Sequence, residues 1–273
     1  MRRTAPKVVW YSEESEDPVG GKASPFAVPP DYVFVHRSLL WRAAAFIVYR
    51  LIMTPAAWVY CRFWLGLRRV DCRTQRPKWG QGCFLYANHT MPVGDAFAPS
   101  VLWFPKRIYV VVSPANLAVK GTRHFLQMVG ALPIPENLTA FRQFREAVFT
   151  RVREGHAVAI YPEAHVWPYY TGIRPFSARS FAFSVAAGAP VYMSTATFQK
   201  RRFCRRPRVT VYLDGPFYPD PALPRRQAEQ ALRDRVYAVL CTRSQNSTYR
   251  AVEYRKRRKP RDPDPVCRQP PDV

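Results

Sequence analysis

Short apolar runs alternate with helix-like segments along most of this chain, and that alternation restricts the fold more than any other feature. Turn residues and amphipathic stretches separate the runs, as in repeated strand and helix units. The alternation predicts an α/β domain, with a central, mostly mixed sheet flanked by helices and a site beyond the strand ends. We predict strands at 83–87, 108–112, 157–161, 191–198 and 209–213, and helices near 95–103, 118–129, 138–153, 178–187 and 224–243.

A histidine and an aspartate follow the first of these strands within one short loop. Residues 88–95 read Asn-His-Thr-Met-Pro-Val-Gly-Asp, so His89 and Asp95 both leave the end of an apolar run. Imidazole can take a proton from a hydroxyl near neutral pH, and a carboxylate can orient the ring. No serine lies in a nucleophile-elbow pattern, which favours direct attack by a substrate hydroxyl. A structural alternative, in which His89 caps the strand and Asp95 caps the next helix, explains these two residues equally well.

A second strand end carries another carboxylate. The strand at 157–161 leads into Pro162 and Glu163, and the following segment, 164–176, is rich in aromatic residues and contains Arg174. An α/β sheet collects its site residues at such strand ends. An ordinary packed loop explains the aromatic residues of this segment better than a membrane-facing groove.

Ordered blocks of the sequence resemble the lysophosphatidic acid acyltransferase family, whose members are 1-acyl-sn-glycerol-3-phosphate acyltransferases of the glycerolipid acyltransferase superfamily. The similarity covers roughly residues 80 to 215, which is one domain's worth of chain. Four blocks in the same order carry this resemblance more strongly than any one block does. Together they make the chain resemble a divergent member of the family. The blocks are 88–95, 120–126 through 130–135, 161–163, and 188–192, which looks like the family's closing strand.

The resemblance implies transfer of a fatty acyl group from acyl-CoA or acyl carrier protein to a hydroxyl of a lysophospholipid, an acceptor like lysophosphatidic acid, in phospholipid biosynthesis. By the same resemblance, His89 is the general base and Asp95 is its partner. Glu163 matches the carboxylate of the family's Phe-Pro-Glu-Gly motif at the acceptor site, and Lys120 lies where the family's cations approach the acceptor phosphate. No metal or cofactor is implied besides the acyl-CoA or acyl carrier protein co-substrate.

Three departures from the family pattern concern the acceptor more than the reaction. Five residues separate His89 from Asp95 in place of the usual four, and a bulge at Gly94 would restore their contact. The arginine that commonly follows the middle block is missing. Glu163 is also not followed by Gly-Thr-Arg, and Arg174 would supply the positive charge of that missing arginine. The candidate acceptor-binding residues are Asn88, Lys120, Arg123, Glu163 and Arg174, with Arg142 and Arg145 as further candidates for the phosphate.

Charge and apolar patterning indicate a lipid surface as partner. The chain has 42 Lys and Arg against 19 Asp and Glu, a net charge of +23, which implies an anionic membrane surface or a nucleic acid. Residues 39–67 favour the membrane, because Arg42, Arg50 and Arg62 break apolar runs that contain Trp and Tyr. Since Pro55 divides this stretch, we expect two short interfacial helices, with core-packed helices or a single tilted span as alternatives.

These observations divide the chain into four parts. They are an irregular lead-in at 1–35, a helical membrane-associating element at 36–70, the acyltransferase domain at 71–250, and a basic, Pro-rich, disordered tail at 251–273. No cleavable signal peptide is apparent, so we expect a membrane-associated protein on the cytoplasmic face. The six cysteines lack CxxC spacing, which predicts neither a zinc site nor a disulfide framework.

Two other interpretations stay open. The extra residue in the His-Asp loop and the altered block around Glu163 are compatible with a catalytically silent lipid-binding protein on the same fold. The charge excess, with basic clusters at 200–208 and 255–261, is compatible with an RNA-binding module. No recognised nucleic-acid motif accompanies that charge, so we expect no specific nucleic acid partner.

Overall fold

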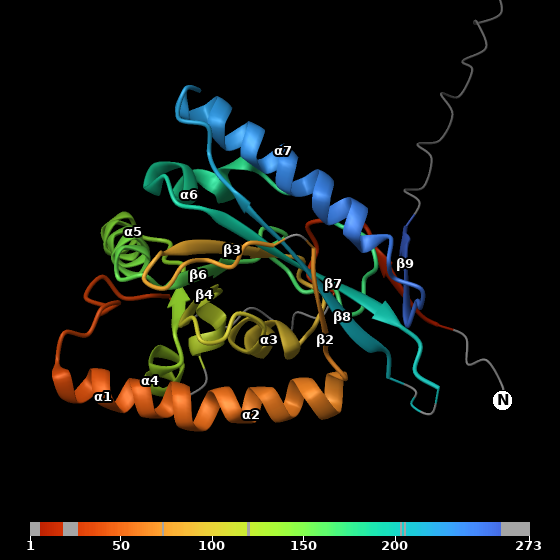
Figure 1. Cartoon of the computed structure of the whole chain (residues 1–273), viewed down its shortest axis with the longest axis horizontal. Helices are drawn as coiled ribbons and strands as arrows, with labels where there is room; N and C mark the ends of the chain where they lie inside the picture. The colour runs from red at the N-terminus through yellow and green to blue at the C-terminus, as the bar shows by residue number, and fades with distance from the viewer. Residues whose placement is uncertain are drawn as a thin grey trace, which may run out of the picture.

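A seven-stranded sheet forms the centre of the molecule (Figure 1). The computed structural model describes residues 6–18, 27–72, 74–118, 121–202, 204 and 206–257. The strand order is β2-β8-β7-β3-β6-β4-β5, with β7 and β8 antiparallel and the other pairs parallel, so the predicted α/β class with a mixed sheet is confirmed. The strands are β2 (Arg68–Asp71), β3 (Cys83–Ala87), β4 (Ile108–Val112), β5 (Ala131–Pro133), β6 (Ala157–Ile160), β7 (Val191–Gln199) and β8 (Arg208–Phe217).

Helices cover both faces of this sheet, because the side chains of a strand alternate between its two faces. On β3, Phe84 and Tyr86 belong to the core formed with α5, α6 and α7, whereas Cys83 and Leu85 belong to the core formed with α3. Because both faces of β3 are buried, the sequence of this strand is an unbroken hydrophobic run. The helices are α3 (Gly94–Leu102), α4 (Arg123–Met128), α5 (Leu138–Arg153), α6 (Ala182–Ala187) and α7 (Arg225–Ser244), with 3₁₀ turns η3 (Pro114–Leu117) and η4 (Ala178–Phe181).

Several predicted boundaries differ from those of the structure. The helix expected near 118–129 is shorter, since η3 and the turn before Arg123 precede α4, and the short strand β5 follows it. The helix expected near 178–187 begins as the 3₁₀ turn η4. Strands β7 and β8 pair along most of their length, from Gln199 with Arg208 to Val191 with Phe217, so they extend beyond the predicted apolar runs.

The amino-terminal apolar stretch is one continuous helix, and the prediction of two helices divided at Pro55 is wrong. It runs through α1 (Leu39–Ile47), η1 (Val48–Met53), α2 (Thr54–Val59) and η2 (Tyr60–Leu65), with π-helical geometry in η1 and η2. Pro55 follows the π-helical segment η1, whose wider turn accommodates the proline ring and its missing N–H. The helix has 27 residues, and an 18-residue stretch within it has a mean hydropathy of 1.4, so by length and composition it could cross a membrane.

The two chain ends form a small parallel ladder of their own. Strand β1 (Lys7–Tyr11) pairs with β9 (Val252–Lys256), in register from Lys7 with Val252 to Tyr11 with Lys256. The expectation of irregular structure over 1–35 is therefore wrong for β1, and that of a disordered tail is wrong for β9. Pairing over so long a chain separation leaves no local sequence signal. The rest of the predicted tail, 258–273, lies outside the described residues.

Candidate active site

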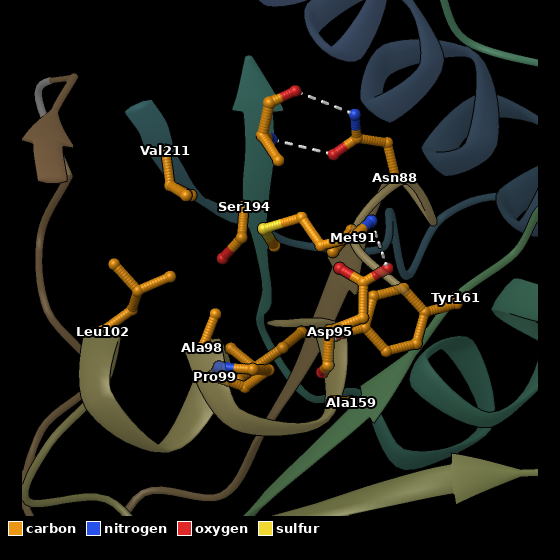
Figure 2. A pocket seen from close by; sticks show the side chains of 13 residues that line it. Asn88, Met91, Asp95, Ala98, Pro99, Leu102, Ala159, Tyr161, Ser194 and Val211 are labelled. Atoms are coloured by element: carbon orange, nitrogen blue, oxygen red, sulfur yellow. Dashed lines mark hydrogen bonds between the residues drawn. The ribbon is translucent and has the colours of Figure 1, made fainter. Parts of the chain in front are cut away.

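His89 and Asp95 meet at the carboxyl end of β3. His89 lies in the loop after the strand, and Asp95 is the second residue of α3. The His89 Nδ1 atom is 2.7 Å from Asp95 Oδ2. The same carboxylate oxygen accepts the Met91 N–H at 3.0 Å, a bond that Figure 2 shows. A carboxylate can only accept, so Nδ1 carries the proton of that bond and Nε2 is left for a substrate proton. This is the arrangement of a base with an orienting acid.

The extra residue between His89 and Asp95 is taken up by a turn, in place of the bulge expected at Gly94. The Asp95 N–H donates to the Met91 carbonyl at 3.0 Å, so the chain already winds as a helix before α3 begins. Gly94 is needed for close packing: a Cβ atom there would lie 2.9 Å from Leu65 Cδ1. The end of the long amino-terminal helix therefore rests directly on the turn that carries Asp95.

Burial sets the electrostatics of this pair. The Asp95 side chain is 3% exposed and that of His89 is 18% exposed. Burial raises the pKa of the Asp95 carboxyl, and the hydrogen bond from His89 opposes that rise. Tyr161 stacks on the His89 ring with centroids 4.4 Å apart, and its hydroxyl donates to the Asp95 carbonyl at 2.5 Å. Burial also raises the pKa of Tyr161, so the phenol stays protonated as this donor.

Glu163 and Arg174 form a buried ion pair behind His89. Arg174 Nη2 is 3.2 Å from Glu163 Oε2, and the two side chains are 2% and 0% exposed. The carboxylate also accepts the backbone N–H groups of His89 at 3.2 Å and Arg174 at 3.1 Å. Neither charge is presented to the surface in this structure. The pair holds the backbone of His89, whereas the sequence had suggested contact with the acceptor.

The other predicted binding residues lie in different settings. Asn88 is 2% exposed, and its amide is clamped to β7 by a pair of bonds with the backbone of Ala196, at 2.8 and 3.0 Å (Figure 2). It joins two neighbouring strands and does not face solvent. Arg123 begins α4, which packs against α1 (Figure 1). Lys120 lies outside the described residues.

A cavity of about 20 Å³ lies beside Asp95 and reaches between α3 and the sheet (Figure 2). Its walls are mostly apolar, and they include Leu85, Ala98, Leu102 and Val211. This volume is enough for about one water molecule. A fatty acyl chain therefore does not fit in the cavity as it stands in this structure.

The fold of this chain has a counterpart among solved structures, although no family model and no curated protein matches the sequence. The chain is similar to the 1-acyl-sn-glycerophosphate (LPA) acyltransferase PlsC from Thermotoga maritima. The two share 12% sequence identity with a TM-score of 0.52, over 79% of this chain and 87% of that one. The chain has the fold of that acyltransferase. At so low an identity the likeness concerns the fold alone.

Sequence reasoning missed two contributors to the site, Tyr161 and Trp167. The backbone N–H of Trp167 donates to the His89 carbonyl at 3.0 Å, and the backbone N–H of Tyr169 donates to the Thr90 carbonyl at 2.9 Å. The aromatic content of 164–176 marked this segment only as a packed loop, because backbone bonds to a distant loop have no residue signature. The position of Tyr161 directly before Pro162 and Glu163 was the one available signal.

Ala164 adopts a left-handed backbone conformation directly after Glu163, with φ at +65°. Such a conformation costs a residue with a Cβ roughly 1–2 kcal/mol, whereas glycine adopts it freely but loses more entropy on folding. We expect Ala164→Gly to raise the free energy of unfolding by about 1 kcal/mol, measured by urea denaturation. The matched control is Ala118→Gly, where φ is −69° and the same change should destabilise the protein. Equal destabilisation by both changes would contradict strain at Ala164.

Proposed function

We propose that this protein is a membrane-associated O-acyltransferase, which moves a fatty acyl group from acyl-CoA or acyl carrier protein to a hydroxyl of a lysophospholipid such as lysophosphatidic acid. The observation that carries the proposal is the hydrogen bond of 2.7 Å between His89 Nδ1 and Asp95 Oδ2 at a strand end. It is supported by a fold shared with an LPA acyltransferase.

The proposed mechanism uses His89 first as a base and then as an acid. The acceptor hydroxyl gives its proton to Nε2 while its oxygen attacks the thioester carbonyl carbon. Asp95 stabilises the imidazolium that forms, through the bond to Nδ1. As the tetrahedral intermediate collapses, the C–S bond breaks and the leaving sulfur takes the proton from Nε2. The products are the acylated phospholipid and the free thiol of the donor.

The remaining residues divide into positioning and acceptor-binding groups. Glu163 and Arg174 position His89, because both side chains are buried and the carboxylate holds the His89 N–H. Asn88 fixes the end of β3 to β7. Lys120 and Arg123 are the cations proposed for the acceptor phosphate, since they lie in the middle block of the resemblance.

The test of this proposal is acyl transfer by the purified protein. Labelled acyl-CoA and acyl carrier protein are each supplied with a panel of lysophospholipids that includes lysophosphatidic acid. Formation of a diacyl product with either donor supports the proposal and identifies the acceptor. No transfer with any pair, together with intact binding to lipid vesicles, would favour a catalytically silent lipid-binding protein. Preferential, salt-sensitive binding of RNA over anionic vesicles would favour an RNA-binding module.

The long amino-terminal helix supports the proposed membrane association. Many of its large apolar side chains are exposed, among them Leu40 at 84%, Leu51 at 65% and Phe63 at 67%. At its end, Arg206 lies over the Trp64 ring and Arg201 donates to the Trp64 carbonyl at 3.0 Å, so the β7–β8 hairpin adds cations to this surface. An apolar face beside arginines fits an anionic lipid surface. We propose that this face lies on the cytoplasmic leaflet.

Introducing a charge on the exposed face of the helix should weaken membrane binding. Phe63→Glu removes a side chain whose burial in lipid would favour membrane binding by about 1.5–3 kcal/mol. We therefore expect at least about tenfold weaker binding to phosphatidylglycerol vesicles. Ala238→Glu adds the same charge on α7, across the sheet (Figure 1), and should bind like wild type. Vesicle co-sedimentation measures both. Equal binding by Phe63→Glu and wild type would place the lipid contact elsewhere.

A further inference from the structure

Two groups that support His89 also contact the amino-terminal segment. The Trp167 indole Nε1 donates to the Glu16 carbonyl at 2.9 Å, and Arg174 Nη1 donates to the Glu14 carbonyl at 3.3 Å. His165 Nδ1 lies 3.5 Å from Asp17 Oδ2. Residues 14–17 therefore run along the outer side of the loop 163–174, and that loop holds both the N–H and the carbonyl of His89.

The carboxyl-terminal strand β9 reaches the same loop. The Tyr254 ring stacks on Trp167 with centroids 4.7 Å apart, and its hydroxyl donates to the Pro168 carbonyl at 3.0 Å. Tyr11, at the end of β1, packs edge-on against Trp167 at 4.8 Å. Together these contacts leave the Trp167 side chain 0% exposed. Because β1 pairs with β9, the two chain ends enclose one tryptophan whose backbone holds His89.

The enclosed loop is strained and depends on such contacts. Ala164 and Tyr169 both have positive φ, at 65° and 58°. Non-glycine residues persist in this conformation only where the surrounding structure over-determines it. The terminal contacts with Trp167, Pro168 and Arg174 supply that constraint from outside the loop. Without them, the loop is free to relax toward ordinary backbone angles and to carry the His89 backbone with it.

We propose that the terminal clasp, defined as Tyr11 to Asp17 together with Tyr254, is a positioning element of the active site. It determines the position of the His89 ring through its contacts with Trp167 and Arg174, and it does not contact the substrate. For turnover the inference rests on the proposed function, but the placement of His89 can be measured without turnover. A shift of a catalytic base by about 1 Å can cost roughly 10²-fold in rate. Loosening the clasp should therefore lower kcat and leave KM nearly unchanged.

The experiment compares Tyr11→Ala and Trp167→Phe with wild type in the full-length protein. Tyr11→Ala removes the edge contact, and Trp167→Phe removes the indole donor while keeping an aromatic ring. We expect kcat to fall about tenfold or more in each, with KM within about twofold. Tyr218→Ala, the same change at a half-exposed tyrosine outside the clasp, should behave like wild type. In parallel, spectra of protein labelled with ¹⁵N-histidine report the Nδ1–H bond of His89.

The outcomes separate this inference from the proposed function. A lowered kcat and displaced His89 resonances in both Tyr11→Ala and Trp167→Phe support the inference. Unchanged kcat and unchanged resonances overturn it. If wild type transfers no acyl group from any donor, the proposed function fails, and the His89 resonances alone decide the positioning role. Should either variant fail to fold, Tyr254→Phe, which loses only the hydroxyl bond to Pro168, carries the same comparison.

Discussion

Replacing His89 with alanine is expected to lower kcat for acyl transfer by roughly 10²–10⁴-fold, the usual contribution of a general base. The imidazole is the group that would take the acceptor proton, and its Nδ1 is already engaged by Asp95 at 2.7 Å. Rates are measured with the best donor and acceptor pair from the panel. His124→Ala is the matched control, because His124 lies on the exposed side of α4 and contacts Trp41. Retained turnover in His89→Ala would reject the proposed base.

Asp95→Asn separates a catalytic role of this carboxylate from a structural one. The change removes the charge that stabilises the imidazolium, so kcat should again fall by about 10²-fold or more. Because burial raises the pKa of Asp95, the ionised form is costly to bury, and the variant should unfold at the same urea concentration or higher. A variant that is less stable but fully active would show that Asp95 serves only to hold the turn before α3, through its bond with the Met91 N–H.

Removing Arg174 should have the largest effect on stability. Its guanidinium pairs with Glu163 where both side chains are almost fully buried, so Arg174→Met leaves a carboxylate without its cation. Losing one partner of a buried pair costs about 3–5 kcal/mol of unfolding free energy. Activity should fall as well, since Glu163 holds the His89 N–H. Arg233→Met, at an ion pair on α7 whose Asp234 is half-exposed, should cost far less.

The cost in Arg174→Met depends on pH in a direction that can be checked. Burial already raises the pKa of Glu163, and loss of the Arg174 charge, which lowers it, raises that pKa further. An acid with a raised folded-state pKa favours folding at low pH and opposes it once ionised. The deficit relative to wild type should therefore grow as pH rises from about 4.3, the ordinary pKa of glutamate. Urea denaturation at acidic and neutral pH measures it, and a deficit independent of pH would mean that Glu163 is not the cause.

Local features of the chain were readable from the sequence because short-range physics produces them. The run Cys83–Ala87 is apolar on both faces of a buried strand, and β3 has the predicted bounds. His89 and Asp95 could be singled out because polar residues after such a strand collect at one edge of the sheet. The continuity of the helix through Pro55 could not be predicted from the sequence. It depends on π-helical turns, and the buried residues Tyr49 and Met53 of these turns pack on the domain.

The roles of the charged residues around the site depend on tertiary contacts and not on local sequence. Glu163 and Arg174 are visible in the sequence as charges near a strand end, and an acceptor site was a reasonable inference from that position. Their burial, and the bond from the His89 N–H to Glu163, arise from the packing of the loop 163–174 against the loop that follows β3. No local pattern encodes such contacts.

Composition and periodicity were thus enough to establish the α/β sheet and to mark His89 and Asp95, because alternation of apolar residues and strand-end chemistry are local properties. The tertiary structure decided which side chains face solvent, how the extra residue before Asp95 is absorbed, and that the two chain ends meet over Trp167. Those outcomes depend on contacts between segments as distant as Lys7 and Val252, and the free energy of such contacts is defined only once the whole chain is folded.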